Sequence, residues 1–236
     1  EPTTKTVSGL IALRRDHPLV SMMSAKESQV LRIARAACCQ CMACTELCPR
    51  ALLGHELRPH RTVRAIQYST IVEDQTDITS AFLCCECGMC ELFACPLGIQ
   101  PRRILADLKK ELIRRGVANP HTRRDLSPDD VREFRQIPSG RLTQRLGLSQ
   151  YDRPAPLSEA HVEPKSVRLL TKQHAGAPAT PVVKAGQDVL EGDLIAEATE
   201  GTLSARVHAS ITGTIKRVGS AEIIIERGPA TPGSTG

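Results

Sequence analysis

The chain has 236 residues, a formal net charge of +5 and only 2% aromatic residues, with no Trp. Such low aromatic content leaves few stacking platforms for single-stranded nucleic acid, and no apolar run approaches the roughly 18 residues that span a bilayer. These properties argue against nucleic-acid binding and membrane insertion, and they predict a soluble chain with two small domains. Because residue 1 is Glu rather than Met, we expect a fragment or a processed chain.

Residues 1–23 are predicted to form a peripheral arm or the last piece of an upstream domain. The run from Thr6 to Leu13 is apolar and follows a turn signal, which predicts an edge strand. His17 and Pro18 then break the pattern. The segment is too short to bury a core by itself.

Residues 24–118 are predicted to form a helical domain that contains all ten cysteines. The sequence Ser24-Ala25-Lys26-Glu27 has the pattern of a capping box, and helical periodicity follows it up to Cys38. Two more helices are expected before Cys84, the second with Asp77 as its N-cap. The positions that give the periodicity are Val30, Leu31, Ile33 and Ala34, then Val63, Ala65, Ile66 and Thr70, then Ile78, Ala81 and Phe82.

The cysteines repeat one pattern twice. The first copy is Cys38-x2-Cys41-x2-Cys44-x3-Cys48-Pro49, and the second copy is Cys84-x2-Cys87-x2-Cys90-x4-Cys95-Pro96. Three thiolates spaced two residues apart and a fourth before a proline are typical of bacterial two-cluster ferredoxins. A tight loop with cysteines at i, i+3 and i+6 wraps three thiolates around one face of a cubane. The sequence therefore predicts two [4Fe-4S] clusters.

The fourth ligand of each cluster is expected to come from the other copy, as it does in two-cluster ferredoxins. One cluster would be held by Cys38, Cys41, Cys44 and Cys95, and the other by Cys84, Cys87, Cys90 and Cys48. Structural zinc prefers two separated pairs of ligands and fits this spacing poorly. A disulfide framework is typical of shorter secreted chains.

Two further cysteines, Cys39 and Cys85, follow the first ligand of each copy. We expect them to be small buried apolar residues, with ligand substitution or redox sensing as the alternatives. Cysteines with cluster spacing indicate a reducing, cytoplasmic compartment in which thiols stay free.

The segment between the two copies has helical periodicity, whereas compact bacterial ferredoxins join their motifs by short strands and turns. It therefore favours the α-helical ferredoxin arrangement. Pro101 begins a further helix and Gly116 ends it, and this helix is expected to pack over the second cluster. Its apolar face is predicted to consist of Ile104, Leu105, Leu108, Leu112 and Ile113.

Residues 119–165 are rich in Pro, Asp, Arg and Ser and predict a linker with short helices. The pairs Arg114-Arg115 and Arg123-Arg124 are expected to be solvated. The alternative is that they dock an acidic partner or a flavin phosphate.

Residues 166–226 are predicted to form a small all-β barrel or sandwich, because short β-rich runs alternate there with glycines. Residues 227–236 are expected to be a disordered tail. The fold class is therefore an α+β multidomain chain. The β-rich runs are Val167–Leu170, Pro181–Lys184, Leu194–Ala198, Ala205–Ala209, Thr214–Val218 and Glu222–Ile225.

The stretch from Val183 to Ile195 resembles the barrel-sandwich hybrid fold of biotinyl and lipoyl domains. In that family a lysine on an exposed hairpin carries the swinging cofactor. Alignment through Ile195-Ala196-Glu197 and Thr212-Gly213-Thr214 places Thr202 at that position. The resemblance implies the fold without lipoylation or biotinylation.

Five motifs extend the resemblance over about residues 5–226. They are Ala37-Cys38-Cys39-Gln40-Cys41, Cys48-Pro49-Arg50-Ala51-Leu52-Leu53-Gly54-His55, Cys87-Gly88-Met89-Cys90-Glu91-Leu92, Ala94-Cys95-Pro96 and Lys172-Gln173-His174-Ala175-Gly176-Ala177-Pro178. Together they resemble the PduS family, the flavin-dependent cobalamin reductases of propanediol-utilisation microcompartments, which are related to the RnfC protein of the Rnf complex. In RnfC the β-domain precedes the clusters. Here it follows them, as in the PduS family, and the x4 spacing before Cys95 agrees.

The resemblance implies the C-terminal, electron-carrying half of such a reductase. Single electrons would pass from a flavin and NADH module to cobalamin or a cobalamin-handling enzyme, inside the cytoplasm or a bacterial microcompartment with its shell proteins. The FMN would belong to an upstream module, because no Gly-x-Gly-x-x-Gly occurs here. The chain by itself is therefore not expected to be an active reductase, and no catalytic residue is predicted.

Two other functions stay open. One is a soluble Rnf-type electron-transport subunit, which would copurify with integral membrane proteins. The other is a docking or scaffold subunit whose clusters are structural. His55, His60, His174 and His208 are expected to be surface or turn residues, with His174 as the candidate for a flavin or cobalamin contact.

Overall fold

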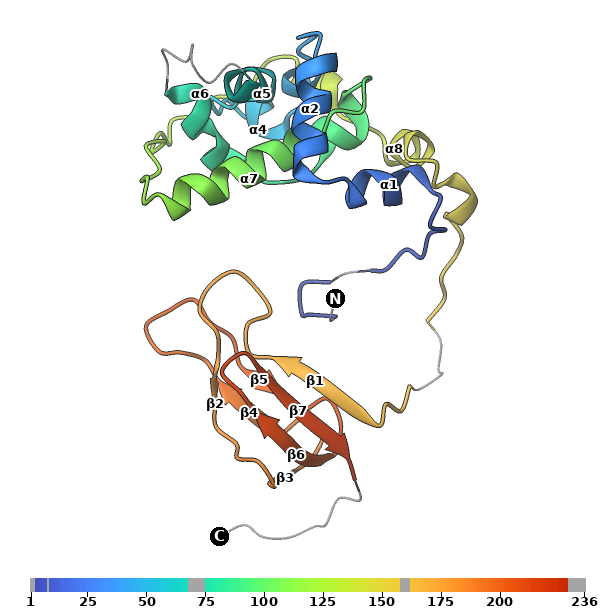
Figure 1. Cartoon of the computed structure of the whole chain (residues 1–236), viewed down its shortest axis with the longest axis vertical. Helices are drawn as coiled ribbons and strands as arrows, with labels where there is room; N and C mark the ends of the chain where they lie inside the picture. The colour runs from blue at the N-terminus through green and yellow to red at the C-terminus, as the bar shows by residue number, and fades with distance from the viewer. Residues whose placement is uncertain (1–2, 8, 68–74, 158–161, 229–236) are drawn as a thin grey trace. The chain divides into compact units, whose positions relative to one another are not determined.

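A computed structural model describes residues 3–7, 9–67, 75–157 and 162–228. The chain divides into two compact units: a helical unit, Leu13–Ala155, and a β unit, Glu1–Ala12 with Pro156–Gly236. Figure 1 shows the helices in the first unit and the strands in the second. Among the described residues no helix is both long and apolar enough to cross a membrane.

The helical unit is built from short helices around the cysteines. Its elements are α1 (Pro18–Ser24), α2 (Glu27–Ala37), α3 (Ala43–Glu46), α4 (Pro49–Leu52), α5 (Pro59–Gln67), α6 (Thr76–Thr79), the 3-10 helix η1 (Ser80–Leu83), the π-helix η2 (Cys90–Ala94), α7 (Pro101–Arg114), the 3-10 helix η3 (Arg132–Arg135), α8 (Ser139–Arg145) and the 3-10 helix η4 (Ser149–Tyr151).

Helix α7 joins two hydrophobic cores of the helical unit. Its Ile104 packs with residues of α2 and α5 in one core, whereas Leu105 and Leu112 belong to a second core that includes Cys48. Proline at its first position loses no hydrogen bond, because that N–H has no partner within a helix. Ile113 is 60% exposed, so its predicted place on the apolar face is wrong.

The start of the helical unit differs from the prediction. Ser24 is the last residue of α1, and its Oγ donates to the carbonyl of Val20 at 2.7 Å. Lys26 precedes α2 without a side-chain cap, so the predicted capping box is wrong. His17 and Pro18 begin a helix instead of ending an element, because His17 Nδ1 accepts a hydrogen bond from the N–H of Leu19 at 3.2 Å.

The helix before the second cysteine copy also begins differently. Gln75 is the N-cap of α6, and Asp77 lies inside the helix, so the predicted Asp77 cap is wrong. A buried hydrogen bond of 3.1 Å joins Thr62 Oγ1 of α5 to Ser80 Oγ of η1, which fixes the approach to Cys84. Thr70 lies outside the described residues.

The segment after α7 is attached to the cysteine loops. The N–H of Asp129 donates to the carbonyl of Leu52 at 2.9 Å, and Arg135 pairs with Glu46 at 2.9 Å. Arg145 Nη2 donates to the carbonyl of Cys95 at 3.3 Å. These contacts hold the short helices η3 and α8 against the helical unit.

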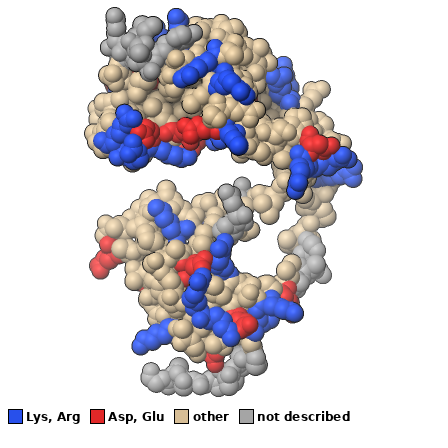
Figure 2. Space-filling model, in the orientation of Figure 1, with Lys and Arg blue, Asp and Glu red and all other residues tan. Residues whose placement is uncertain are grey.

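The paired arginines at the end of α7 are solvated, as predicted. The side chains of Arg114 and Arg115 are 71% and 66% exposed, and both pair with Glu111. Figure 2 shows acidic and basic side chains intermixed on this face of the helical unit. Arg123 is 54% exposed and pairs with Asp125 at 3.1 Å.

The β unit is formed by antiparallel strands in two sheets, with strand orders β1-β7-β6-β3 and β2-β4-β5. Its core contains four fully buried isoleucines, Ile195, Ile215, Ile223 and Ile225. Strand β3 was not predicted, because its two residues lie outside the β-rich runs, whereas the two-residue strands β2 and β5 overlap such runs. The strands are β1 (Ser166–Leu170), β2 (Thr180–Pro181), β3 (Asp188–Val189), β4 (Leu194–Glu197), β5 (Val207–His208), β6 (Gly213–Val218) and β7 (Glu222–Arg227).

The N-terminal residues attach to the β unit without forming a strand. The N–H of Lys5 donates to Gln173 Oε1 at 3.1 Å, and Thr6 Oγ1 donates to the carbonyl of Gln173 at 3.4 Å. Leu10 and Ile11 are 84% and 65% exposed. The edge strand predicted over Thr6–Leu13 is therefore wrong for the described residues. Ser8 and residues 229–236 of the predicted tail lie outside them.

Gly213 is a test of the β-unit packing, because a Cβ at this position would collide with the backbone oxygen of Glu226. We expect Gly213→Ala to lower the free energy of unfolding by about 2 kcal/mol, measured by thermal and denaturant unfolding of the full chain. Gly228→Ala is the matched control, since its Cβ would meet only Thr214 Oγ1 at 3.9 Å. Equal stability of the two variants would contradict the close approach of β6 and β7.

Candidate iron–sulfur sites

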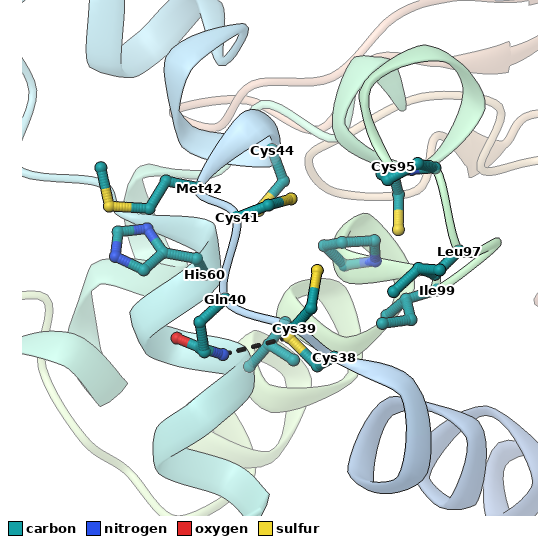
Figure 3. A pocket seen from close by; sticks show the side chains of 13 residues that line it. Cys38, Cys39, Gln40, Cys41, Met42, Cys44, His60, Cys95, Leu97 and Ile99 are labelled. Carbon is teal, nitrogen blue, oxygen red and sulfur yellow. Dashed lines mark hydrogen bonds between the residues drawn. The ribbon is translucent and has the colours of Figure 1, made fainter.

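The first cavity is lined by three cysteines of the first copy and one of the second: Cys38, Cys41, Cys44 and Cys95. Figure 3 shows Cys95 facing the loop of Cys41 and Cys44 across this space. The other described residues of the lining are uncharged or imidazole-bearing: Cys39, Gln40, Met42, His60, Val63, Pro96, Leu97, Ile99 and Pro101.

The second cavity has the reciprocal composition: Cys84, Cys87 and Cys90 of the second copy with Cys48 of the first. The structure therefore brings together both predicted sets of four cysteines. The rest of this lining consists of Pro49, Arg50, Leu57, Pro59, Cys85, Gly88, Arg102 and Leu105.

Each cysteine loop uses the left-handed backbone conformation at the same two positions. Gln40 and Glu86 have φ of 55° and 58°, and Met42 and Gly88 have φ of 64° and 81°. This conformation costs an L-residue about 1–2 kcal/mol. It turns the chain so sharply that cysteines three residues apart face one space. Of the four positions, only Gly88 is a glycine, the residue that adopts this conformation readily, so the sequence indicated the conformation only there.

The longer spacing before Cys95 is absorbed by a π-helical turn. Residues Cys90–Ala94 form η2, whereas the equivalent segment of the first copy contains α3, followed by Leu47 and Cys48. A π-helix bonds residue i to i+5 and so takes more residues into a turn than an α-helix. From the sequence, the x4 spacing was used only as support for the family resemblance. The π-helical turn was not predicted.

Burial keeps the inner thiols protonated when no metal is bound. Desolvation raises the pKa of Cys44 to about 12 and also raises the pKa of Cys48 and Cys90. Iron binding must therefore displace protons from these thiols, which couples occupancy of the sites to pH.

N–H groups surround several cysteine sulfurs. The amide of Gln40 donates to Cys38 Sγ at 3.0 Å, and the N–H of Glu86 donates to Cys84 Sγ at 3.4 Å. Burial raises the pKa of Cys48, and the backbone N–H groups of Arg50 and Ala51 at the start of α4 partly offset this effect. Such donors stabilise the anionic sulfur ligands of a cluster and tune its potential.

The helices that follow the two copies present matching positions to the cavities. In α5, His60 and Val63 line the first cavity and Pro59 lines the second. In α7, Arg102 and Leu105 line the second cavity and Pro101 lines the first. In both helices, therefore, the proline faces one cavity, and the residues one and four positions after it face the other cavity. The cavity that the proline faces differs between the two helices.

The residue after the third cysteine of each copy holds the first turn of the following helix. In the first copy, Thr45 Oγ1 lies 2.7 Å from His60 Nδ1 and accepts from the N–H of His60 at 3.4 Å. Burial, with nearby arginines of α5, lowers the pKa of His60. His60 was predicted to be a surface or turn residue. It is instead a helical residue of the cavity lining, so that prediction is wrong.

In the second copy the equivalent contact is charged. Glu91 Oε1 accepts from Arg102 Nε at 2.7 Å, and Glu91 Oε2 accepts from the N–H of Arg103 at 3.1 Å. The side chain of Glu91 is only 1% exposed. This pair was not predicted, although its signal is a carboxylate that directly follows a ligand-type cysteine.

The additional cysteines differ from the prediction. Cys39 and Cys85 are exposed, and each lines a cavity beside the four cysteines. Their prediction as buried apolar residues is therefore wrong. His174 lies in the β unit, where its Nδ1 is 2.6 Å from the carbonyl oxygen of Ala175.

The donor sets suit a cluster of several irons better than a single ion. In the described part of the chain, no group of three or more His, Cys, Asp or Glu is close enough to hold one metal ion. A tetrahedral zinc site needs four ligands about 2.0–2.3 Å from one centre. Four thiols around a cavity instead suit iron–sulfur chemistry, in which each thiolate binds a different iron.

Gly88 provides a test of the loop geometry. A Cβ at Gly88 would lie 2.9 Å from Leu92 Cδ1 in addition to the positive φ. We expect Gly88→Ala to speed iron loss to a chelator about tenfold, because the strain of about 1–2 kcal/mol falls on the loaded loop. Met42→Gly at the equivalent position of the first copy removes strain and should not speed the loss. Equal rates for both variants would contradict the shared loop conformation.

Comparison with known proteins supports this description. Residues 37–100 match the family model of a 4Fe-4S dicluster domain, and residues 150–231 match the RnfC barrel sandwich hybrid domain. Cobalamin reductases PduS from Citrobacter freundii and Salmonella typhimurium are each 41% identical over 96% of this chain. The alignment covers 50% of each of these proteins, so the chain spans about half their length.

A second group of relatives aligns over a shorter region. The RnfC-type component of the ion-translocating oxidoreductase complex of Pseudomonas aeruginosa is 42% identical over 66 residues, which is 28% of this chain and 8% of that protein. The predicted resemblance to both groups is confirmed, and the two [4Fe-4S] clusters follow from the dicluster match and the cysteine count. The chain is therefore a homologue of the cobalamin reductase PduS, and its 4Fe-4S dicluster domain for electron transfer precedes an RnfC-type barrel-sandwich hybrid domain.

Proposed function

We propose that this chain relays single electrons from a flavin and NADH module to cobalamin. The observation that carries the proposal is the exchange of cysteines between the copies: each cavity is lined by three cysteines of one copy and the Cys-Pro cysteine of the other. When bound, a [4Fe-4S] cluster supplies one-electron redox chemistry with an unchanged set of protein ligands.

The proposed ligands are the eight cysteines of the two cavities. Cys38, Cys41, Cys44 and Cys95 would hold one cluster, and Cys84, Cys87, Cys90 and Cys48 the other. Cys44 lies in the short helix α3 and Cys48 follows the end of that helix by two residues, but the two cysteines belong to different cavities. Four residues of helix rise about 6 Å, so the two sites adjoin closely enough for electron exchange.

The exposure of the cysteines favours a relay over purely structural clusters. Cys48 and Cys90 are each 7% exposed, whereas Cys41 and Cys87 are exposed at the surface. Both buried cysteines belong to the second site, and in the first site Cys44 and Cys95 are partly buried. Each site therefore has an open edge, at Cys41 or at Cys87, and a more enclosed side. A donor can approach one edge and an acceptor the other, while water is kept from the inner ligands.

The donor and the acceptor are proposed from the relatives. Two relatives that align over 96% of the chain are named cobalamin reductases, which supports cobalamin, or an enzyme that handles it, as acceptor. The flavin module with its FMN is proposed to lie outside residues 1–236, because no dinucleotide-binding glycine motif occurs within them. The same relatives support a place in the cytoplasm, within a microcompartment and near its shell proteins.

A second candidate function is electron transport within an ion-translocating complex. The match to the RnfC-type component of such a complex and the RnfC-type domain support it. This candidate predicts copurification with integral membrane proteins, whereas the cobalamin reductase proposal predicts transfer of electrons to cobalamin without them.

Reconstitution with iron and sulfide under anaerobic conditions tests the cluster content. We expect about eight irons per chain, and the dithionite-reduced protein should give the EPR signals of two magnetically coupled S = 1/2 clusters. Bound zinc or a single cluster would contradict the relay. Cys39→Ser and Cys85→Ser are controls that should keep the full iron content.

The exchange of the fourth cysteine has its own test. We expect Cys95→Ala to leave the same reduced EPR signal as Cys41→Ala, because both remove a ligand of the first site. Cys48→Ala should instead leave the signal that Cys87→Ala leaves. If Cys95→Ala matches Cys87→Ala, each copy binds its own cluster with all four cysteines, and the proposed ligand sets are wrong.

A further inference from the structure

The two cavities have matching frames but different charges. Among the described residues that line the first cavity, none is Lys, Arg, Asp or Glu. The second cavity is lined by Arg50 and Arg102, and no described carboxylate belongs to its lining. The two sites are otherwise equivalent, but only the second site has fixed positive charges in its described lining.

Arg102 is held in place against the second cysteine loop. Its Nε donates to Glu91 Oε1 at 2.7 Å, and the Arg102 side chain is 23% exposed. Its Cδ lies 4.0 Å from the position that a Cβ on Gly88 would occupy, so its stem runs along the glycine between Cys87 and Cys90. Arg102 lines the cavity, whereas Glu91, which directly follows Cys90, is not part of the lining.

Arg50 is the second fixed charge at this cavity. It lies in the first turn of α4, directly after Cys48 and Pro49, and its Nη1 is 3.2 Å from His55 Nε2. The nearby pair of Lys109 and Glu86, at 3.5 Å, combines opposite charges and is not part of the lining. It therefore does not offset the two arginines.

The position equivalent to Arg102 in the first cavity is occupied by His60, which contacts Thr45 through an imidazole–hydroxyl hydrogen bond. This pair carries no permanent charge. The first site thus has Thr45 and His60 at the positions where the second site has Glu91 and Arg102. The two sites therefore differ in charge at equivalent backbone positions, and His60 and Arg102 line the cavities that contain the cysteines.

Resting on the proposed function, we propose that Arg50 and Arg102 raise the reduction potential of the cluster held by Cys48, Cys84, Cys87 and Cys90 above that of the other cluster. Reduction adds one negative charge to a cluster, and fixed positive charge in a partly buried wall stabilises the reduced form. Glu91 is a positioning residue that keeps Arg102 at the cavity. A single electron on the chain then resides at this second site.

Potentiometric titration of the full, reconstituted chain, followed by EPR, tests the inference. Arg50→Gln removes one positive charge. The double variant Glu91→Gln with Arg102→Gln removes the second positive charge together with the charge of its partner Glu91, so that no buried carboxylate is left unpaired. In Arg50→Gln the ratio of reduced to oxidised second cluster at a fixed potential should fall about tenfold, which is about 59 mV for a one-electron couple. In the double variant it should fall by less, because the loss of the Glu91 charge partly offsets the loss of the Arg102 charge. The first cluster should keep its potential, and the Cys41→Ala and Cys87→Ala spectra identify the two signals.

Arg103→Gln is the matched control, because Arg103 neighbours Arg102 on α7 but does not line the second cavity. It should shift neither potential. Equal shifts of both clusters, a shift of the first cluster alone, or unchanged potentials in a chain with about eight irons would overturn the inference and leave the relay intact. A wild-type chain with fewer than two reducible clusters would instead overturn the proposed function and this inference with it.

Discussion

The organisation of the helical unit depends on one constraint: each cysteine copy supplies three side chains to one cavity and one to the other. Neither cavity is complete until both copies have folded together. The segments that cross from one cavity to the other are α3 and η2, and both are a single turn long. Metal binding therefore stabilises the association of two regions far apart in sequence, and it couples the folding of each to the other.

The surrounding helices satisfy this constraint with a shared frame. The first turns of α5 and α7 lie between the cavities, and each begins with a proline that costs no hydrogen bond. The residue after the third cysteine fixes that turn in both copies, through Thr45 in one and Glu91 in the other. Because the backbone is so similar, a change of side chain at these positions alters the electrostatics of one site without altering its shape.

The remaining parts of the chain attach to this frame or form the separate β unit. Contacts of Asp129 and Arg145 with the cysteine segments hold the residues after α7 on the helical unit. The β unit has its own core of isoleucines, and the N-terminal residues bond to its Gln173. Thr202, which the sequence alignment predicts at the position of the modified lysine in biotinyl and lipoyl domains, lies in the exposed connection between β4 and β5. A threonine side chain cannot form the amide to the cofactor.

The sequence by itself determined the features that depend on local spacing. The i, i+3 and i+6 cysteines identified the metal chemistry, the apolar periodicity located α2, α5 and α7, and glycine-punctuated β-rich runs indicated most strands of the β unit. Contacts between distant segments were decided only by the tertiary structure. The features that such contacts decide include the exposure of Cys39 and Cys85, the hydrogen bond of Arg145 to the carbonyl of Cys95, and the pairing of Glu91 with Arg102. The physical reason is that burial and hydrogen-bond partners depend on which segments pack together, whereas periodicity reports only the shape of each segment.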